Sequence, residues 1–342
     1  MKRVFLVALF VVCSFLSAPL HAYAADFSIT VSPSFLLLNT NPGQSTSGTV
    51  RVQNNGSQTQ NLTIGFLKIK PATSGDQLDL TQANPNDPFL TWVTLDKDRL
   101  EIAPGRSETV QLTIHAPSEA ALGYYYALSL QDENAAVTGS DNTVVTAATA
   151  VPILLEVVVP EAARDIQIVD YSVSRAFYDY LPATFRITLK NTGNVHVAPR
   201  GNIFINKAKD KNAATAIATL DVNNDSAGGY ILPGSTRVFT ATFTDGFPHY
   251  NEPELSDTRH LEWDFSKADT LRIGKYEGTL VLVYDNVNQD ESVEGIVYFW
   301  IVPWELILGG LGIIIILYNL KSIFQRIKQW RMTAWQRLTG KR

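Results

Sequence analysis

Hydrophobic and polar residues alternate with a two-residue period along most of this chain. In the segment TVQLTIH, Val110, Leu112 and Ile114 share one face, and polar side chains occupy the other. The same alternation recurs in three further segments: TFRITLK (184–190), RVFTATF (237–243) and TLVLVYD (279–285). Alternation of this kind predicts half-buried β-strands. No comparable period of 3.6 residues appears before residue 303, so we expect antiparallel sandwiches rather than a parallel sheet covered by helices.

Turn signals recur in the two halves of the chain and indicate a weak internal repeat. The first half contains NNG at 54–56 and PG at 104–105, and the second half contains NTG at 191–193 and PG at 233–234. Asn and Gly favour tight turns, and Pro-Gly favours a type II turn. The sequence therefore predicts two tandem immunoglobulin-like domains, residues 25–160 and 164–302, joined by VVVPEAARD. The spacing after the second PG predicts an insertion at residues 247–269.

The C-terminal part of the chain has a different pattern. Residues 306–320 carry no charge and form a candidate transmembrane helix, predicted over 303–320. Fifteen helical residues span about 22 Å, which is less than the hydrocarbon thickness, so residues 300–304 are expected to supply the missing length. Trp300, Trp304 and Tyr318, followed by Lys321, are the expected residues at the membrane interface.

The tail that follows, residues 321–342, is basic and amphipathic. It contains seven Lys or Arg residues and no Asp or Glu. The positive-inside rule therefore predicts a cytoplasmic tail. Phe324, Ile327, Trp330, Ala334 and Leu338 follow helical spacing, as expected for a helix on the inner membrane surface. A role for these cations in nucleic-acid binding is the weaker interpretation, because the basic run is short and lies beside a predicted membrane span.

The N-terminal residues predict export. Residues 1–24 combine a basic start, an apolar run and the small-x-small sequence AYA, so we expect a signal peptide cleaved between Ala24 and Ala25. Cys13 is the one cysteine and lies within this segment, so no disulfide is expected in the mature chain. Export without disulfides favours a bacterial cell-surface protein. The remaining body is acidic, which disfavours nucleic acid as a partner.

This layout resembles that of the WxL-interacting cell-surface proteins of Gram-positive bacteria. The resemblance includes PGQSTSGTVRVQNNGSQTQNLTI (42–64), LEIAPGRSETVQLTIHAPSEAALGYYYALSL (100–130) and VPILLEVVVP (151–160). It implies a non-catalytic scaffold in the cell envelope that binds peptidoglycan through its first domain and also binds a partner surface protein. It assigns no individual binding residue.

Three consecutive tyrosines are the candidate ligand contacts. Tyr124 and Tyr126 point to one face of a strand and Tyr125 to the other, because side chains alternate. Either the pair or the single residue must therefore belong to the core. The outward member could contact a sugar ring or a partner protein.

Catalytic and metal-binding motifs are not recognised, so we expect no enzyme, cofactor or metal. The histidines after residue 24 lie at positions 115, 196, 249 and 260, without metal-ligand spacing. Two alternatives remain open. One is a wall-acting hydrolase that uses carboxylates of the insertion, such as Glu254 and Glu262. The other is a structural subunit of an envelope or secretion complex.

Overall fold

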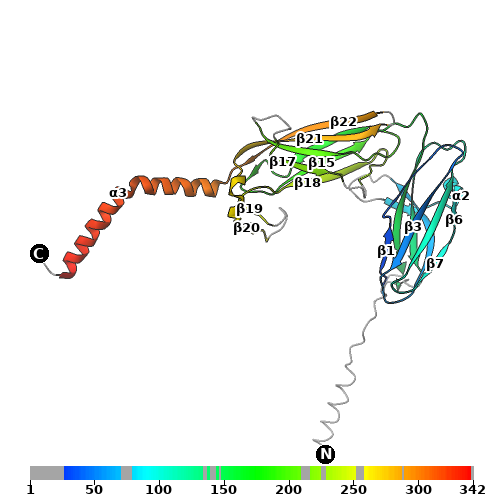
Figure 1. The fold of residues 1–342 in the computed structure, drawn as a ribbon, viewed down its shortest axis with the longest axis horizontal. Coiled ribbons are helices and arrows are strands. Elements are labelled where there is room, and N and C mark those ends of the chain that lie inside the picture. Colours follow the sequence, from blue (N-terminus) through cyan, green and yellow to red (C-terminus); the bar gives the residue numbers. More distant parts are fainter. Residues whose placement is uncertain are drawn as a thin grey trace, which may run out of the picture. The chain divides into compact units, whose positions relative to one another are not determined.

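The computed structural model describes residues 27–70, 79–133, 137–138, 144–145, 148–208, 216–224, 229–251, 258–286 and 289–339. The predicted signal peptide and its cleavage site lie outside these residues. The chain divides into two compact units (Figure 1), with the boundary between Glu161 and Ala162.

Unit 1 is a sandwich of two β-sheets. One sheet has the order β1 (Ile29–Ser32), β3 (Ser45–Asn54), β8 (Ser107–His115), β6 (Val93–Leu95). The other has the order β2 (Leu36–Thr40), β12 (Ala148–Val157), β9 (Leu122–Asp132), β4 (Gln60–Lys70), β5 (Asp79–Gln82), and β7 (Arg99–Ile102) also pairs with β4. The short elements are helix α2 (Pro88–Trp92) and the pair β10 (Val137–Thr138) and β11 (Val144–Val145). β12 runs parallel to β2 and antiparallel to β9.

Unit 2 is a second sandwich. Its smaller sheet has the order β13 (Ile166–Val173), β15 (Ala183–Asn191), β18 (Thr236–Phe243). Its larger sheet has the order β14 (Phe177–Tyr178), β22 (Gln289–Ile301), β21 (Gly274–Asn286), β16 (Arg200–Lys207), β17 (Ala218–Val222). A hairpin of β19 (His249–Tyr250) and β20 (Leu261–Glu262) and the 3₁₀ helix η2 (Phe265–Thr270) lie between β18 and β21. Helix α3 (Trp304–Thr339) follows β22.

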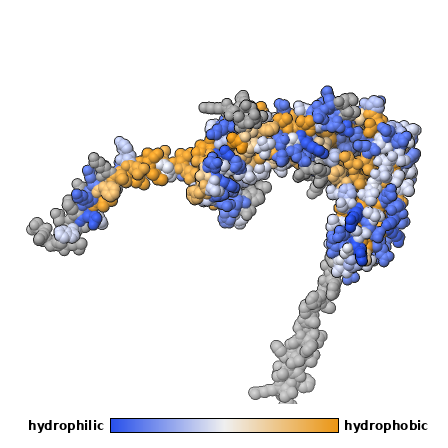
Figure 2. Space-filling model, viewed as in Figure 1, coloured by the Kyte–Doolittle hydropathy of each residue, from blue (hydrophilic) through white to orange (hydrophobic). Residues whose placement is uncertain are grey.

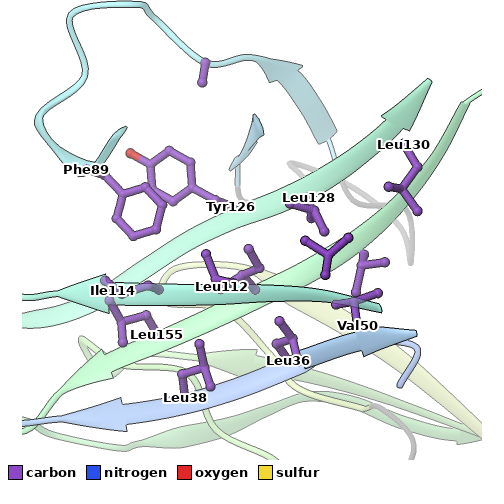
Figure 3. Packing of buried hydrophobic residues seen from close by; sticks show 14 of the residues in the cluster. Leu36, Leu38, Val50, Phe89, Leu112, Ile114, Tyr126, Leu128, Leu130 and Leu155 are labelled. Carbon is purple, nitrogen blue, oxygen red and sulfur yellow. The ribbon is translucent and has the colours of Figure 1, made fainter. Parts of the chain in front are cut away.

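The alternation seen in the sequence becomes the packing of each sandwich. In β8, Val110, Leu112 and Ile114 are fully buried, and they meet residues of the opposite sheet such as Leu128 and Leu155 (Figure 3). Unit 2 has an equivalent core, with Phe185 and Leu280 among its buried members. The prediction of an all-β sandwich fold is therefore confirmed.

The turn signals of the internal repeat make equivalent hydrogen bonds in the two units. Asn54 and Asn191 are both fully buried. The Asn54 side-chain amide donates to the carbonyl oxygens of Gln58 and Ile102 at 2.7 and 2.8 Å. Asn191 donates in the same way to Val195 and Ile231, both at 2.8 Å. In both units, a buried asparagine joins a tight turn to a neighbouring segment.

The Pro-Gly turns complete this repeated arrangement. The backbone N–H of Gly105 donates to the Asn54 carbonyl at 2.9 Å, and that of Gly234 donates to the Asn191 carbonyl at 3.0 Å. The two glycines have φ of 69° and 74°. A type II turn needs a positive φ at this position, which explains the glycine.

Candidate functional site

The structure assigns the tyrosine pair to the core side of its strand. Tyr126 is buried in β9 as a member of the unit 1 core, and Tyr124 packs against that core. Phe89 of α2 stacks on Tyr126 with ring centroids 3.9 Å apart (Figure 3), and Trp92 meets Tyr124 edge to face at 4.8 Å. These contacts fix α2 against β9, so Tyr124 and Tyr126 do not form an exposed platform for a sugar ring.

Tyr125 points to the opposite side of β9 and is partly exposed. Its hydroxyl end lies over Gly123, because a Cβ added at that glycine would be 2.1 Å from the Tyr125 hydroxyl oxygen. Of the three predicted ligand contacts, Tyr125 therefore keeps the orientation that binding would require, and the structure does not bring it together with the other two.

The sequence pattern does not predict the hydrogen bonds that Asp87 makes beside these rings. Asp87 Oδ2 accepts from the Tyr126 hydroxyl at 2.7 Å and from Lys68 Nζ at 2.8 Å, and Asp87 Oδ1 accepts from the Phe89 N–H at 3.2 Å. Burial and the hydrogen bond to Asp87 raise the pKa of Tyr126 to about 12. Burial alone would raise the pKa of Asp87, but its bonds to Lys68 and Tyr126 lower it. Asp87 before Pro88 is a helix-start signal that could have revealed α2.

The most prominent unassigned surface is the outer face of the larger sheet in unit 2. Along β22, Val297, Phe299 and Ile301 face the core, so the alternate residues Ile296, Tyr298 and Trp300 point outward. All three are exposed. We call the outward residues of β16, β21 and β22 the β22 face. Besides Ile296, Tyr298 and Trp300, it includes Phe204, Asn206, Lys275, Glu277, Thr279 and Val283. Phe177 of β14 adjoins this face.

Two buried polar groups lie in the β22 face. Asn206 and Glu277 are cross-strand partners, and Glu277 is also opposite Tyr298. They are only 3% and 4% exposed, so both are shielded from water. Glu277 Oε1 accepts from Thr279 Oγ1 at 3.3 Å, and a hydrogen bond from the Tyr298 hydroxyl to the Glu277 carboxylate raises the pKa of Tyr298. Glu277 Oε2 and Asn206 Oδ1 are buried without a hydrogen-bond partner among the described residues. A buried acceptor without a donor costs about 1–3 kcal/mol.

Aromatic and charged groups border this pair of acceptors. Lys275 Nζ lies 4.2 Å from the centroid of the Tyr298 ring, in a cation–π contact. Phe177 stacks on Trp300 with centroids 6.4 Å apart. The β22 face therefore places exposed aromatic side chains and a cation around a buried polar pair. These features are typical of the centre of a protein interface.

The predicted interface residues near the membrane fall in two elements. Trp300 belongs to β22, where it pairs with Lys275, so residues 300–303 do not lengthen the helix as expected. Helix α3 begins at Trp304 and continues without interruption to Thr339, within the predicted tail. Tyr318 and Lys321 lie within α3, and Tyr318 is exposed.

Helix α3 is apolar on all sides in its first part. Leu308, Ile313, Ile314 and Leu317 are each exposed, and Figure 2 shows this stretch as a continuous hydrophobic surface. Among the described residues, no helix combines the length and apolarity that a membrane span requires.

The histidines do not converge on one site. His115 shares a 2.8 Å hydrogen bond with Ser45, its cross-strand neighbour. Burial lowers the pKa of His196 to about 4. His249 Nε2 lies 3.8 Å from Glu262, a carboxylate that the hydrolase alternative would use, whereas Glu254 is outside the described residues. In the part of the chain that the structure describes, no group of three or more His, Cys, Asp or Glu residues could hold a metal ion.

Comparison with known proteins finds similarity only at the level of solved structures. No protein-family model matches the chain, and no curated protein matches it. The class 5 fimbriae chaperone CfaA is 13% identical, with a TM-score of 0.36, over 79% of this chain and 98% of that chain. The CsuC–CsuE chaperone and tip subunit complex of Acinetobacter baumannii is 14% identical, with a TM-score of 0.33, over 62% of this chain and 89% of that chain.

The Escherichia coli chaperone DraB is also similar, at 10% identity and a TM-score of 0.32, over 79% of this chain and 96% of that chain. Because these identities and TM-scores are low, we infer the function of this chain from its own residues.

Proposed function

We propose that this protein is a non-enzymatic, membrane-anchored bacterial surface protein whose second immunoglobulin-like domain binds another surface protein through the β22 face. The observation that carries the proposal is the row of exposed side chains Ile296, Tyr298 and Trp300 along one face of β22. A partner that covers this face would remove Ile296, Tyr298 and Trp300 from water together.

Membrane anchoring is supported by α3 and by the charge distribution. A helix that is apolar on all sides needs an apolar environment, and the exposed side chains of its first part have that character. The basic residues that follow favour the cytoplasmic side of an anionic membrane. In this proposal, both sandwiches lie outside the cell and the tail lies inside.

Two other functions remain alternatives. Peptidoglycan binding by residues 25–160, which the resemblance to WxL-interacting proteins implies, stays a prediction, with Tyr125 as the remaining tyrosine candidate. A structural subunit of an envelope complex would use the same outward surfaces, but its contacts would depend on α3.

Site-specific photocrosslinking in intact cells tests the proposal. A benzophenone amino acid at Ile296 should give a crosslinked product with a second protein, whereas the same group at Val169 should not. The two positions form a matched pair, because both are 56% exposed and lie on strands of the same unit. The double substitution Tyr298→Ser and Trp300→Ser should reduce the amount of crosslinked product at position 296 several-fold.

Equal crosslinking at both positions, or none at either, would contradict the assignment of the β22 face. Sedimentation with insoluble peptidoglycan that is unchanged by Ile296→Asp would favour wall binding instead. A product that disappears when α3 is replaced by an unrelated membrane helix would favour the envelope-complex alternative.

A further inference from the structure

The segment between β18 and β21 exposes a cluster of large apolar side chains. Trp263, Phe265, Leu271 and Ile273 are all exposed, and Phe265 is 73% exposed. Phe247 lies beneath the two aromatic rings, with its centroid 5.9 Å from Trp263 and 5.4 Å from Phe265. We call these five residues the aromatic rim. Clustered apolar exposure of this kind marks a surface that contacts another apolar phase.

The rim is held in place by backbone and polar contacts. The Asp264 side chain accepts from the Ser266 N–H at 3.1 Å and caps η2. Arg272 Nε donates to the Asp245 carbonyl at 3.0 Å, and its guanidinium also pairs with the Asp245 carboxylate. These bonds fix both ends of the segment, so the exposure of the rings is a property of the folded unit.

The rim lies at the end of unit 2 from which α3 departs. Leu271 and Ile273 immediately precede β21, and Gly274, the first residue of β21, pairs with Ile301, the last residue of β22. The hairpin is at the same end, because the Tyr250 N–H donates to the Leu181 carbonyl at 2.8 Å, and Leu181 closely follows Tyr178, which pairs with Ile301. Only Val302 and Pro303 separate β22 from α3, and two residues span at most about 7 Å.

We propose that the aromatic rim docks into the headgroup region of the membrane that α3 enters. This inference rests on the membrane anchoring proposed above. Trp and Phe side chains are favourable at the boundary between headgroups and acyl chains, and a second contact beside the helix would restrict rotation of unit 2 on the membrane. Restricted rotation would hold the β22 face in one orientation relative to the surface.

Spin labels on the full-length chain test this inference. In a Cys13→Ser background, single cysteines would be placed at Ala268 beside the rim, at Ile313 in α3, and at Asp290 at the opposite end of β22. The protein would be reconstituted into vesicles of phosphatidylcholine and phosphatidylglycerol (3:1). Power saturation with oxygen and with a water-soluble nickel chelate would then report the depth of each label.

We expect an interfacial depth at position 268, a hydrocarbon depth at 313 and an aqueous environment at 290. Replacing Trp263 and Phe265 with Ser should move the 268 label to an aqueous environment and leave the 313 label unchanged. An unchanged circular dichroism spectrum would show that this double variant is folded. If that variant unfolds, the label depths in the parent chain still decide the outcome.

An aqueous label at 268 together with a buried label at 313 would overturn the rim inference and leave the anchor intact. An aqueous label at 313 would overturn the anchor and the rim inference with it. A label at 268 that is shielded from both reagents would show that protein covers the rim, which would also overturn the inference.

Discussion

At the residue scale, two buried asparagines show which parts of the fold could be predicted from sequence. Asn54 and Asn191 lie in turn signals that are visible in the sequence, and the structure confirms both turns. Their second contacts, to Ile102 and Ile231, could not be predicted, because these partners come from segments about forty or more residues away. Local turn chemistry is readable from sequence, whereas long-range pairing depends on the tertiary fold.

The tyrosine segment shows the same limit. Alternation separates Tyr125 from Tyr124 and Tyr126, but it does not say which side faces the core. That choice depends on Phe89 and Trp92 of α2, which pack against the pair. The five-residue helix that carries them is too short to show a helical period, and only its Asp-Pro start signals it.

The Tyr126 hydroxyl gives a prediction with a specific pH dependence. Tyr126→Phe should lower the free energy of unfolding by about 2 kcal/mol at neutral pH, because it removes a hydrogen bond to the Asp87 carboxylate. Folding raises the pKa of Tyr126 from about 10 in the unfolded chain to about 12. The wild-type advantage should therefore be constant below pH 10 and diminish as the pH rises toward 12.

Pulse proteolysis in urea over this pH range would measure the difference. Tyr124→Phe is the matched control, because the Tyr124 hydroxyl only accepts a 3.4 Å bond at an exposed site. A difference that persists unchanged at pH 12 would contradict the assigned contact.

At the scale of elements, strands were predictable from alternation, but their neighbours were not. β8, β15, β18 and β21 each contain a segment whose alternation predicts a strand. The same alternation could not place β21 between β16 and β22, so the β22 face and its two buried acceptors were missed. The sequence predicts the apolar stretch and the basic tail as two separate segments, whereas α3 continues from the first into the second as far as Thr339.

Glycine at position 201 tests the packing between β16 and β21. A Cβ at Gly201 would lie 2.0 Å from the Val281 carbonyl oxygen, so Gly201→Ala must push two backbones apart. We expect a loss of about 3 kcal/mol or more in the stability of unit 2. Gly65→Ala is the control, since nothing lies within 4 Å of its added Cβ; its effect should stay within about 1 kcal/mol.

Hydrogen exchange measured by mass spectrometry would localise the effect. In the Gly201→Ala variant, peptides from β16 and β21 should exchange faster, while peptides from unit 1 keep their protection. Unchanged protection in β16 and β21 would mean that the two strands accommodate a methyl group and are not in such close contact.

At the scale of the whole molecule, charge and apolarity divide the sequence into regions that suit different environments. The chain as a whole has a net charge of −5, yet its last 22 residues contain seven cations and no anion. The acidic body is therefore more negative than the overall value indicates. This asymmetry, together with the exposed apolar part of α3, supports the proposed topology, in which the sandwiches and the tail occupy opposite sides of a membrane.

Cysteine labelling in intact cells tests that topology most directly. In a Cys13→Ser background, single cysteines would replace Thr219, an exposed residue of β17, and Lys341 in the tail. A membrane-impermeant maleimide should label position 219 in wall-stripped intact cells, and should label position 341 only after the membrane is permeabilised. Labelling of 341 in intact cells, or protection of 219 until permeabilisation, would contradict the proposed membrane-anchored surface protein.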